Sequence, residues 1–189
     1  MRLFVAIDLP EETRGRLETL LADLRSMPLR ISWARPEGIH LTLRFLGEVP
    51  QGRLEVIASA LEAAGGDHAP FSLEVAGVGA FPGKGAPRVL WAGVSGDARP
   101  VATLKRAIER SLEAAAFVPD DRAFEPHLTL GRVKGPGRGD WRSVLARHAG
   151  ERFGSVEVRE FVLFESQLTP AGALYRVLRR FPLSGSATT

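Results

Sequence analysis

Two copies of one tetrapeptide hold the side chains of this sequence that are best suited to chemistry. Residues 40–43 read His-Leu-Thr-Leu, and the same four residues return at 127–130, an offset of 87, in a chain with only four histidines. Alternate side chains of a strand share a face, so each copy presents one imidazole and one hydroxyl together and turns its leucines the other way. Two imidazoles that face one substrate suit general acid–base chemistry, in which one group takes a proton while the other gives one.

Phosphodiester cleavage is the reaction that this set of groups fits best. The attacking oxygen loses a proton while the leaving oxygen, on the opposite side of phosphorus, gains one. The hydroxyls of Thr42 and Thr129 would donate to the non-bridging oxygens, which carry charge in the transition state. Two alternatives stay open at this point. The repeated motif can be an ordinary strand preserved by duplication, or a metal site, although two histidines fall short of the usual three or four ligands.

The rest of the chain repeats at the same offset as the tetrapeptides. Apolar periodicity predicts strands at 2–8 and 89–95, helices at 11–26 and 98–113, helices at 52–64 and 139–151, and strands at 70–78 and 157–165. Further strands are expected at 31–34 and 174–181. We therefore predict one bilobal α+β domain over residues 1–189, built from a duplicated unit that covers about 2–80 and 88–181. Two similar lobes that pack about a pseudo-two-fold axis would place both tetrapeptides in one groove between antiparallel sheets.

The composition excludes several classes of protein. The 189 residues include no cysteine, which rules out disulfide scaffolds, thiolate zinc sites and a cysteine nucleophile. The apolar and charged shares, 44% and 25%, are those of a globular protein. A net charge of +3 favours contact with only a few phosphates. No apolar stretch reaches transmembrane length and the N-terminus turns acidic too early for a signal peptide, so we expect a cytoplasmic protein without a membrane partner.

The flanks of the tetrapeptides resemble a known superfamily. The sequence reads HLTLRFLG at 40–47 and FEPHLTLGR at 124–132, with RLFVAIDLP near the N-terminus and PRVLWAGV at 87–94. These segments are similar to those of the 2H phosphoesterases, which are named for two His-x-Thr-x motifs. Within that superfamily they resemble the bacterial and archaeal RNA 2′,3′-cyclic phosphodiesterases, also called 2′-5′ RNA ligases. The resemblance extends over residues 2–181.

The resemblance implies a reaction and the residues that perform it. The reaction is hydrolysis of an RNA 3′-terminal 2′,3′-cyclic phosphate to a 2′-phosphate, with no metal and no other cofactor. His40 would donate a proton to the leaving 3′-oxygen, His127 would accept one from water, and Thr42 and Thr129 would bind the phosphate. The near-symmetric sequence does not by itself say which histidine is the acid. The implied partner is RNA with such an end, including tRNA halves, which some members join by 2′-5′ bonds.

Two arginines are further candidates for phosphate contact, because a positioned guanidinium clamps phosphate well. Strict alternation puts Arg44 on the histidine face of its strand and Arg132 on the opposite face of the other. A bulge at Gly131 would turn Arg132 inward. Family members carry an arginine at this second position, so the resemblance also favours Arg132.

An RNA end also offers a base that can stack on an aromatic ring. Phe81 and Phe124 are the candidates for stacking, although core packing is the other interpretation of both, and Phe45 is expected in the core. Two other functions fit the same residues. One is a non-catalytic protein that binds RNA ends, and the other is a phosphodiesterase for a small cyclic nucleotide. We expect the protein to be a monomer.

Overall fold

The computed structural model describes residues 1–120, 122–135, 140–170 and 172–186. The strands are β1 (Arg2–Ile7), β2 (Ile31–Trp33), β3 (Leu41–Glu48), β4 (Phe71–Phe81), β5 (Val89–Ser95), β6 (His127–Val133), β7 (Arg152–Val158), β8 (Glu160–Thr169) and β9 (Gly172–Pro182). The α-helices are α1 (Glu11–Arg25), α2 (Leu54–Gly66), α3 (Arg99–Ala114) and α4 (Trp141–His148). Two short 3₁₀ turns, η1 (Pro36–Gly38) and η2 (Gln51–Arg53), precede β3 and α2.

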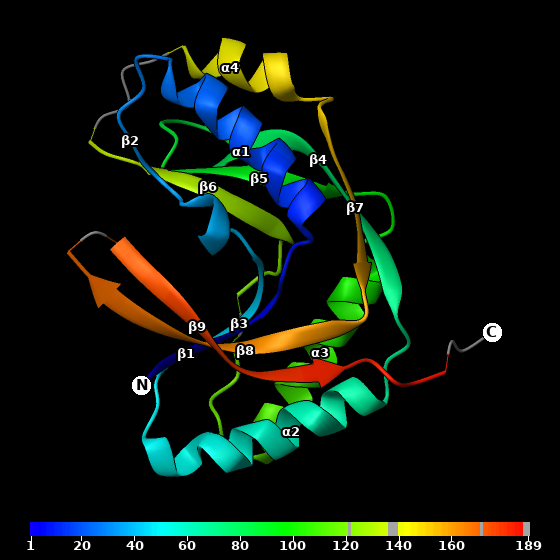
Figure 1. Ribbon diagram of the computed structural model, residues 1–189. Helices are drawn as coiled ribbons and strands as arrows, with labels where there is room; N and C mark the ends of the chain where they lie inside the picture. Colours follow the sequence, from blue (N-terminus) through cyan, green and yellow to red (C-terminus); the bar gives the residue numbers. More distant parts are fainter. Residues whose placement is uncertain (121, 136–139, 171, 187–189) are drawn as a thin grey trace.

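The strands of the described residues form one curled, nine-stranded antiparallel sheet. Its order is β7-β4-β5-β6-β3-β1-β8-β9, and β2 pairs with β6 beside β3. Helices α2 and α3 pack together on one side of the molecule, while α1 lies against β7 and α4 against β4 on the other (Figure 1). The predicted α+β fold with antiparallel lobes around a central groove is confirmed.

Each lobe combines elements from both halves of the sequence. We call β1, β3, β8 and β9, with α2 and α3, the first lobe. The second lobe is β4 to β7 with β2, α1 and α4. The elements recur in the same order at the offset of 87, but α1 and β4 of the first half belong to the second lobe, and α3 and β8 of the second half belong to the first. The two halves are therefore interleaved, which ties the lobes together.

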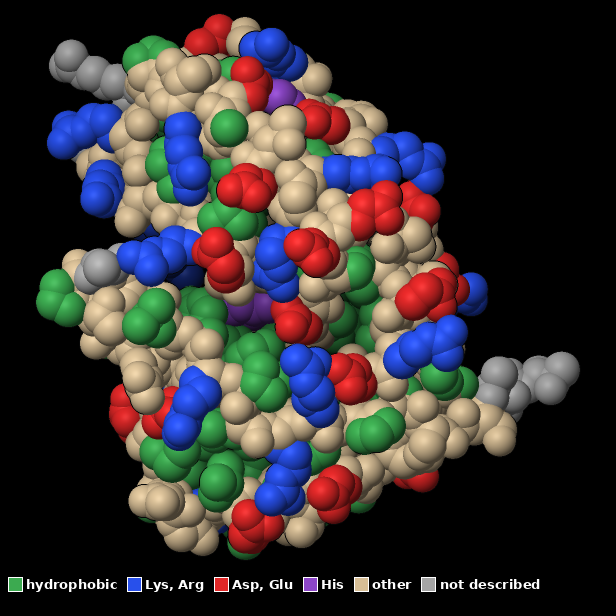
Figure 2. Space-filling view, viewed as in Figure 1, with side chains coloured by type: hydrophobic (Ala, Val, Ile, Leu, Met, Phe, Trp, Pro, Cys, Tyr) green, Lys and Arg blue, Asp and Glu red, His purple; other side chains and the backbone are tan. Residues whose placement is uncertain are grey.

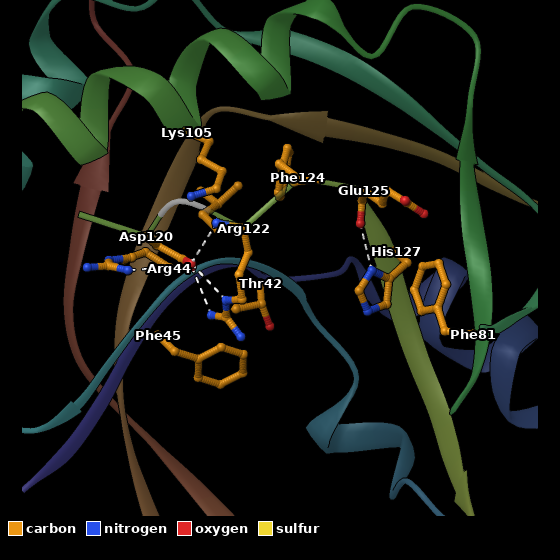
Figure 3. A pocket seen from close by; sticks show the side chains of 12 residues that line it. Thr42, Arg44, Phe45, Phe81, Lys105, Asp120, Arg122, Phe124, Glu125 and His127 are labelled. Atoms are coloured by element: carbon orange, nitrogen blue, oxygen red, sulfur yellow. Dashed lines mark hydrogen bonds and ion pairs between the residues drawn. The ribbon is translucent and has the colours of Figure 1, made fainter. Parts of the chain in front are cut away.

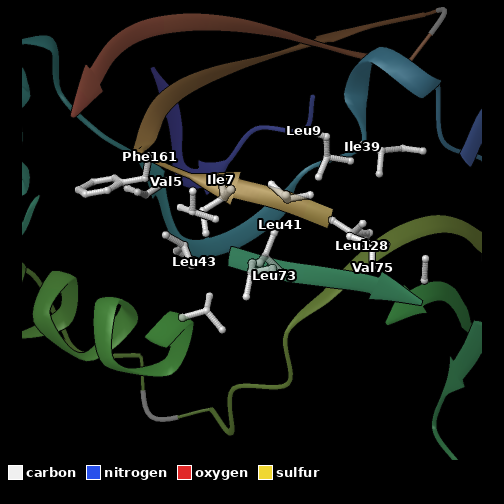
Figure 4. Close-up of a cluster of buried hydrophobic side chains, with 14 of the residues drawn as sticks. Val5, Ile7, Leu9, Ile39, Leu41, Leu43, Leu73, Val75, Leu128 and Phe161 are labelled. Carbon is white, nitrogen blue, oxygen red and sulfur yellow. The ribbon is translucent and has the colours of Figure 1, made fainter. Parts of the chain in front are cut away.

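One continuous apolar core lies between the sheet and the helices of both lobes. The alternating strands bury one face, as in β1, where Leu3, Val5 and Ile7 are at most 2% exposed. Figure 4 shows Val5 and Ile7 in one cluster with apolar side chains of β3, β4 and β6. A second, smaller apolar cluster occupies the concave face of the first lobe and consists of Phe4, Ala6, Val162 and Phe164.

The predicted elements are present, with one error in the second half. The strand expected at 157–165 is two strands, β7 and β8, separated at Arg159. The sequence image of β7 in the first half is 65–71, the last two residues of α2 and the connection as far as the first residue of β4, so the repeat gave no sign of it. The helix expected at 139–151 is described from Trp141 to His148, and residue 139 lies outside the described residues. None of the described helices has the length and apolar character needed to cross a membrane.

Gly131 of β6 packs closely against β2. A Cβ atom at Gly131 would lie 2.4 Å from Cγ2 of Ile31 and 3.1 Å from the carbonyl oxygen of Ser32. We expect Gly131→Ala to destabilise the protein by about 1–3 kcal/mol, because β2 must move away. Urea unfolding measures this. The control is Gly15→Ala in α1, where no atom lies within 4 Å of the added methyl group. It should stabilise the helix by about 0.5–1 kcal/mol. If both variants changed the free energy of unfolding by the same amount, the close packing of β2 on Gly131 would be contradicted.

Candidate active site

β3 and β6 meet at the centre of the sheet through one antiparallel pair, Leu41 opposite Leu128. Both leucines are buried in the apolar core, 2% and 0% exposed. Side chains alternate along a strand, so the residues on either side of each leucine point to the other, concave face of the sheet. Those residues are the histidine and threonine of each tetrapeptide, and all four are half-buried there. The structure thus brings the two motifs together on one surface.

The register of this pair decides which side chains become neighbours. In an antiparallel register, Thr42 follows Leu41 and lies beside His127, while His40 lies beside Thr129. Two adjoining cavities open on this surface, and both include Thr42 and Phe45. The His40 cavity, of about 390 Å³, also contains His40, Thr129 and Arg132. The His127 cavity, of about 320 Å³, also contains His127, Phe81, Phe124 and Arg122 (Figure 3).

His40 sits in a cage of aromatic rings. Its imidazole stacks on Phe4, with ring centres 4.6 Å apart, and meets the edge of Tyr175 at 5.2 Å. Phe164 lies behind Phe4 and completes the cage. Burial in this apolar surrounding lowers the pKa of His40 from 6.5 to about 4, although a hydrogen bond with the Gly38 backbone partly opposes the shift. The imidazole is therefore neutral near pH 7 while the site is empty.

His127 has a more open surrounding and a fixed orientation. Its Nδ1 lies 2.6 Å from the carbonyl oxygen of Glu125, and the ring of Phe81 meets it edge-on at 5.0 Å (Figure 3). A carbonyl oxygen only accepts hydrogen bonds, so Nδ1 carries the hydrogen. The other nitrogen, Nε2, then holds a free electron pair in the neutral ring. This tautomer suits a group that takes a proton.

A β-bulge follows each tetrapeptide and reverses the alternation there. Leu43 has no partner between the β1–β3 pairs at Thr42 and Arg44, and Leu130 has none between the β5–β6 pairs at Thr129 and Gly131. The bulge expected at Gly131 is confirmed.

The reversal places Phe45 and Arg132 at equivalent positions on the cleft face. Arg132 is exposed and lines the His40 cavity. The expectation that Phe45 is in the core is wrong, since it is 48% exposed and lines both cavities. The face predicted for Arg44 is wrong for the same reason, because strict alternation does not continue through a bulge.

Arg44 lines the His127 cavity, but its guanidinium is buried in an ion-pair network. It is 8% exposed, donates a hydrogen bond to the carbonyl oxygen of Val118, and lies 3.4 Å from Asp120 and 3.5 Å from Glu109. Arg53 similarly donates to the carbonyl oxygen of Ala115. Both arginines come from the first lobe, and their partners surround the start of the segment that leads into β6. We therefore assign Arg44 to holding this segment, which carries part of the His127 cavity.

Arg122 is a residue of the cleft that the sequence analysis did not identify. Its guanidinium makes two hydrogen bonds to Asp120, at 2.7 and 2.8 Å, and in the view of Figure 3 it is drawn above the ring of Phe45. This pairing holds the pKa of Asp120 well below its usual range. No local pattern distinguishes Arg122 from other surface arginines, because its position depends on the loop that Arg44 holds.

The two phenylalanines predicted to stack both line the His127 cavity. Phe81 contacts His127 and packs against Trp91 at 5.2 Å. Phe124 lies under the ammonium group of Lys105, 5.7 Å from it. Phe45 offers a third aromatic surface, and Tyr175 a fourth in the His40 cavity. Among the described residues, no group of three or more His, Cys, Asp or Glu side chains is arranged to hold a metal ion.

A curled antiparallel sheet with a His-x-Thr pair from each of two strands in one cleft defines a two-histidine phosphoesterase. Comparison with protein families agrees with this class. The family described as LigT-like phosphoesterase matches residues 7–91 and again residues 93–175, so the chain belongs to that family.

Individual relatives are similar along nearly the whole chain. The RNA 2′,3′-cyclic phosphodiesterase of Archaeoglobus fulgidus is 38% identical over 181 residues, which is 96% of this chain and 99% of the relative. That of Methanothermobacter thermautotrophicus is 35% identical over 187 residues, 97% and 99% of the two chains. The crystal structure of TT0787 of Thermus thermophilus has a TM-score of 0.82 at 33% identity and 98% and 99% coverage. E. coli LigT complexed with 3′-AMP has a TM-score of 0.77 at 26% identity and 97% and 98% coverage.

The aromatic cage predicts the titration of His40 in the free protein. We expect its pKa near 4, measured by following the imidazole in ¹H–¹³C NMR spectra. Tyr175→Ala opens the cage to water and should raise the pKa toward 6.5, whereas Tyr175→Phe keeps the ring and should leave it low. Because the folded state binds fewer protons than the unfolded state between pH 4 and 6.5, stability should fall as the pH falls through this range. If the pKa of His40 in the wild-type protein is near 6.5, the aromatic rings do not exclude water from the imidazole.

Proposed function

We propose that this protein hydrolyses the 2′,3′-cyclic phosphate at the 3′ end of RNA to a 2′-phosphomonoester. The register of β3 and β6 carries the proposal, because it brings two imidazoles and two hydroxyls to one surface. The names of the relatives from Archaeoglobus fulgidus and Methanothermobacter thermautotrophicus support the choice of substrate. In this proposal the phosphate lies at the border of the two cavities, between His40 and His127.

His127 is the proton acceptor in this proposal. Its Nδ1–H is bound to the carbonyl oxygen of Glu125, so Nε2 is the nitrogen that can take a proton from water. The water oxygen attacks phosphorus from the side of the His127 cavity as its proton passes to Nε2. The edge-on contact with Phe81 and the short hydrogen bond to Glu125 hold the ring in this orientation.

His40 is the proton donor on the opposite side of phosphorus. As the new P–O bond forms, the bond from phosphorus to the 3′-oxygen breaks, and that oxygen takes a proton from the imidazolium of His40. The 2′-oxygen stays bonded to phosphorus, so the product is the 2′-phosphomonoester. His40 must be protonated for this step although its pKa is low in the empty site. A phosphate anion close to the ring favours the charged form, so substrate and proton bind together.

The hydroxyls of Thr42 and Thr129 and the guanidinium of Arg132 bind the phosphate in this proposal. One threonine lies beside each histidine, which suits contact with the two non-bridging oxygens. Arg132 lines the same cavity as His40 and Thr129. We propose further that the protein acts as a monomer in the cytoplasm, without a metal or other cofactor. Its RNA substrates would include tRNA halves, and the reverse reaction would join two such halves by a 2′-5′ bond.

The reaction itself is the first prediction of this proposal. A short RNA with a 2′,3′-cyclic phosphate end, incubated with the protein in EDTA, should give the 2′-phosphomonoester, seen by ³¹P NMR. His40→Ala and His127→Ala should each lower kcat by about 10²- to 10⁴-fold, because each removes one proton transfer. The matched control is His68→Ala, since the imidazole of His68 bonds the carbonyl oxygen of Ala64 and His68 lines neither cavity. Tight binding of the RNA without turnover would support the non-catalytic alternative.

The two histidines can be distinguished with a modified substrate. In a cyclic phosphate whose 3′-oxygen is replaced by sulfur, the leaving thiolate needs no proton, because a thiol is far more acidic than an alcohol. This substrate should restore most of the activity of His40→Ala and little of that of His127→Ala. Single-turnover rates of both variants on both substrates make the comparison. If the modified substrate restores the activity of His127→Ala instead, His127 is the proton donor and His40 the acceptor. The proposed reaction would remain the same.

A further inference from the structure

The two cavities of the cleft differ in charge. Around the His127 cavity, each cation that lines it lies against a carboxylate. Lys105 pairs with Glu109 at 2.5 Å, Arg122 pairs with Asp120 at 2.7 Å, and Arg44 lies between these two acids. Glu125 adds a further carboxylate to the same wall. Three cations therefore face three acids among the described residues, and the wall has no net charge with which to attract a polyanion.

The His40 cavity has a different lining. Arg35 and Arg132 line it, and no acid is among its described lining residues. Both arginines are exposed. They come from the segment that follows β2 and from β6, so they belong to the second lobe. Arg132 forms no salt bridge with a described carboxylate, so it is the cation of this cavity that can meet a phosphate backbone.

The positive surface continues outward from Arg132 along β2 and β6. Ser32 of β2 pairs with Arg132, and both line the His40 cavity. Two residues further, the backbone nitrogen of Lys134 donates to the carbonyl oxygen of Arg30, 2.7 Å away. Arg30 and Lys134 stand one residue beyond the ends of β2 and β6, on either side of this hydrogen bond.

Arg30 and Lys134 are both exposed, and no described carboxylate forms a salt bridge with either. Basic side chains gather in Figure 2 on the upper left of the molecule, above the cleft and over these strands. Arg132, Arg30 and Lys134 are called the basic track below. Two residues of a strand span about 7 Å, so the track extends beyond the cavity by roughly the reach of one nucleotide.

We propose that the RNA strand leaves the cleft along the basic track, on the 5′ side of its terminal nucleotide. This inference rests on the proposed function. If His40 protonates the leaving 3′-oxygen, the terminal ribose lies on the His40 side of phosphorus, and water enters on the His127 side. The remainder of the RNA is joined to that ribose through its 5′-carbon, so it must depart from the His40 cavity. Arg30 and Lys134 then meet the phosphates that follow the terminal nucleotide.

The proposal is tested by comparing substrates of two lengths. Wild-type protein and the variant Arg30→Gln/Lys134→Gln are assayed on a mononucleoside 2′,3′-cyclic phosphate and on an oligonucleotide with the same end. We expect the variant to keep wild-type kcat/KM on the mononucleoside and to lose about tenfold on the oligonucleotide, through KM. The slope of log kcat/KM against log salt should become shallower by about 1.4 on the oligonucleotide, since each phosphate contact of a single strand contributes about 0.7.

The control variant is Arg110→Gln/Arg159→Gln, which removes the same charge from exposed positions outside the cleft. It should behave as the wild type on both substrates. If the control loses as much as the track variant, the effect is one of net charge and the basic track is wrong. If Arg122→Gln alone removes the preference for the oligonucleotide, the RNA leaves through the His127 cavity instead. If the wild type hydrolyses neither substrate, the proposed function itself fails, which distinguishes that result from a failure of the track.

Discussion

The pairing of Leu41 with Leu128 is the constraint on which the rest of the structure depends. It joins the two lobes at the centre of the sheet, and burial of the leucines in the core fixes its register. A slip of one residue would turn leucines toward water and the histidines and threonines into the core. Each exposed leucine would cost about 1.5–3 kcal/mol. The apolar side chains therefore hold the polar side chains of the opposite face in place.

Two identical tetrapeptides acquire different properties from their surroundings. The imidazole of His40 is enclosed by rings of β1, β8 and β9, which lowers its pKa. That of His127 is more open and is oriented by the carbonyl oxygen of Glu125. The pseudo-symmetric fold thus gives two histidines at equivalent positions with different surroundings. General acid–base catalysis uses two groups in different roles, because one group must give a proton while the other takes one.

The two bulges and the buried ion pairs complete the cleft. In each strand the bulge turns the residue five positions after the histidine toward the cleft. This residue is Phe45 in β3, an aromatic ring, and Arg132 in β6, a cation. Arg44 is turned away by the same bulge and holds the segment that carries Arg122. Its buried guanidinium is compensated by Asp120 and Glu109, as a buried charge must be. The result is a set of paired charges around the His127 cavity, and an exposed Arg132 in the lining of the His40 cavity.

The sequence by itself determined the candidate reacting groups, most of the order of the elements and the fold class. The repeated tetrapeptide, the periodicity of the strands and helices, and the bulge at Gly131 are local patterns, and local patterns are legible in one chain. The tertiary structure alone decided the rest. The positions of Phe45 and Arg44 depend on a bulge that the sequence of β3 does not reveal. The exchange of strands between lobes, the cage around His40 and the placement of Arg122 all join residues far apart in the chain, where no spacing rule applies.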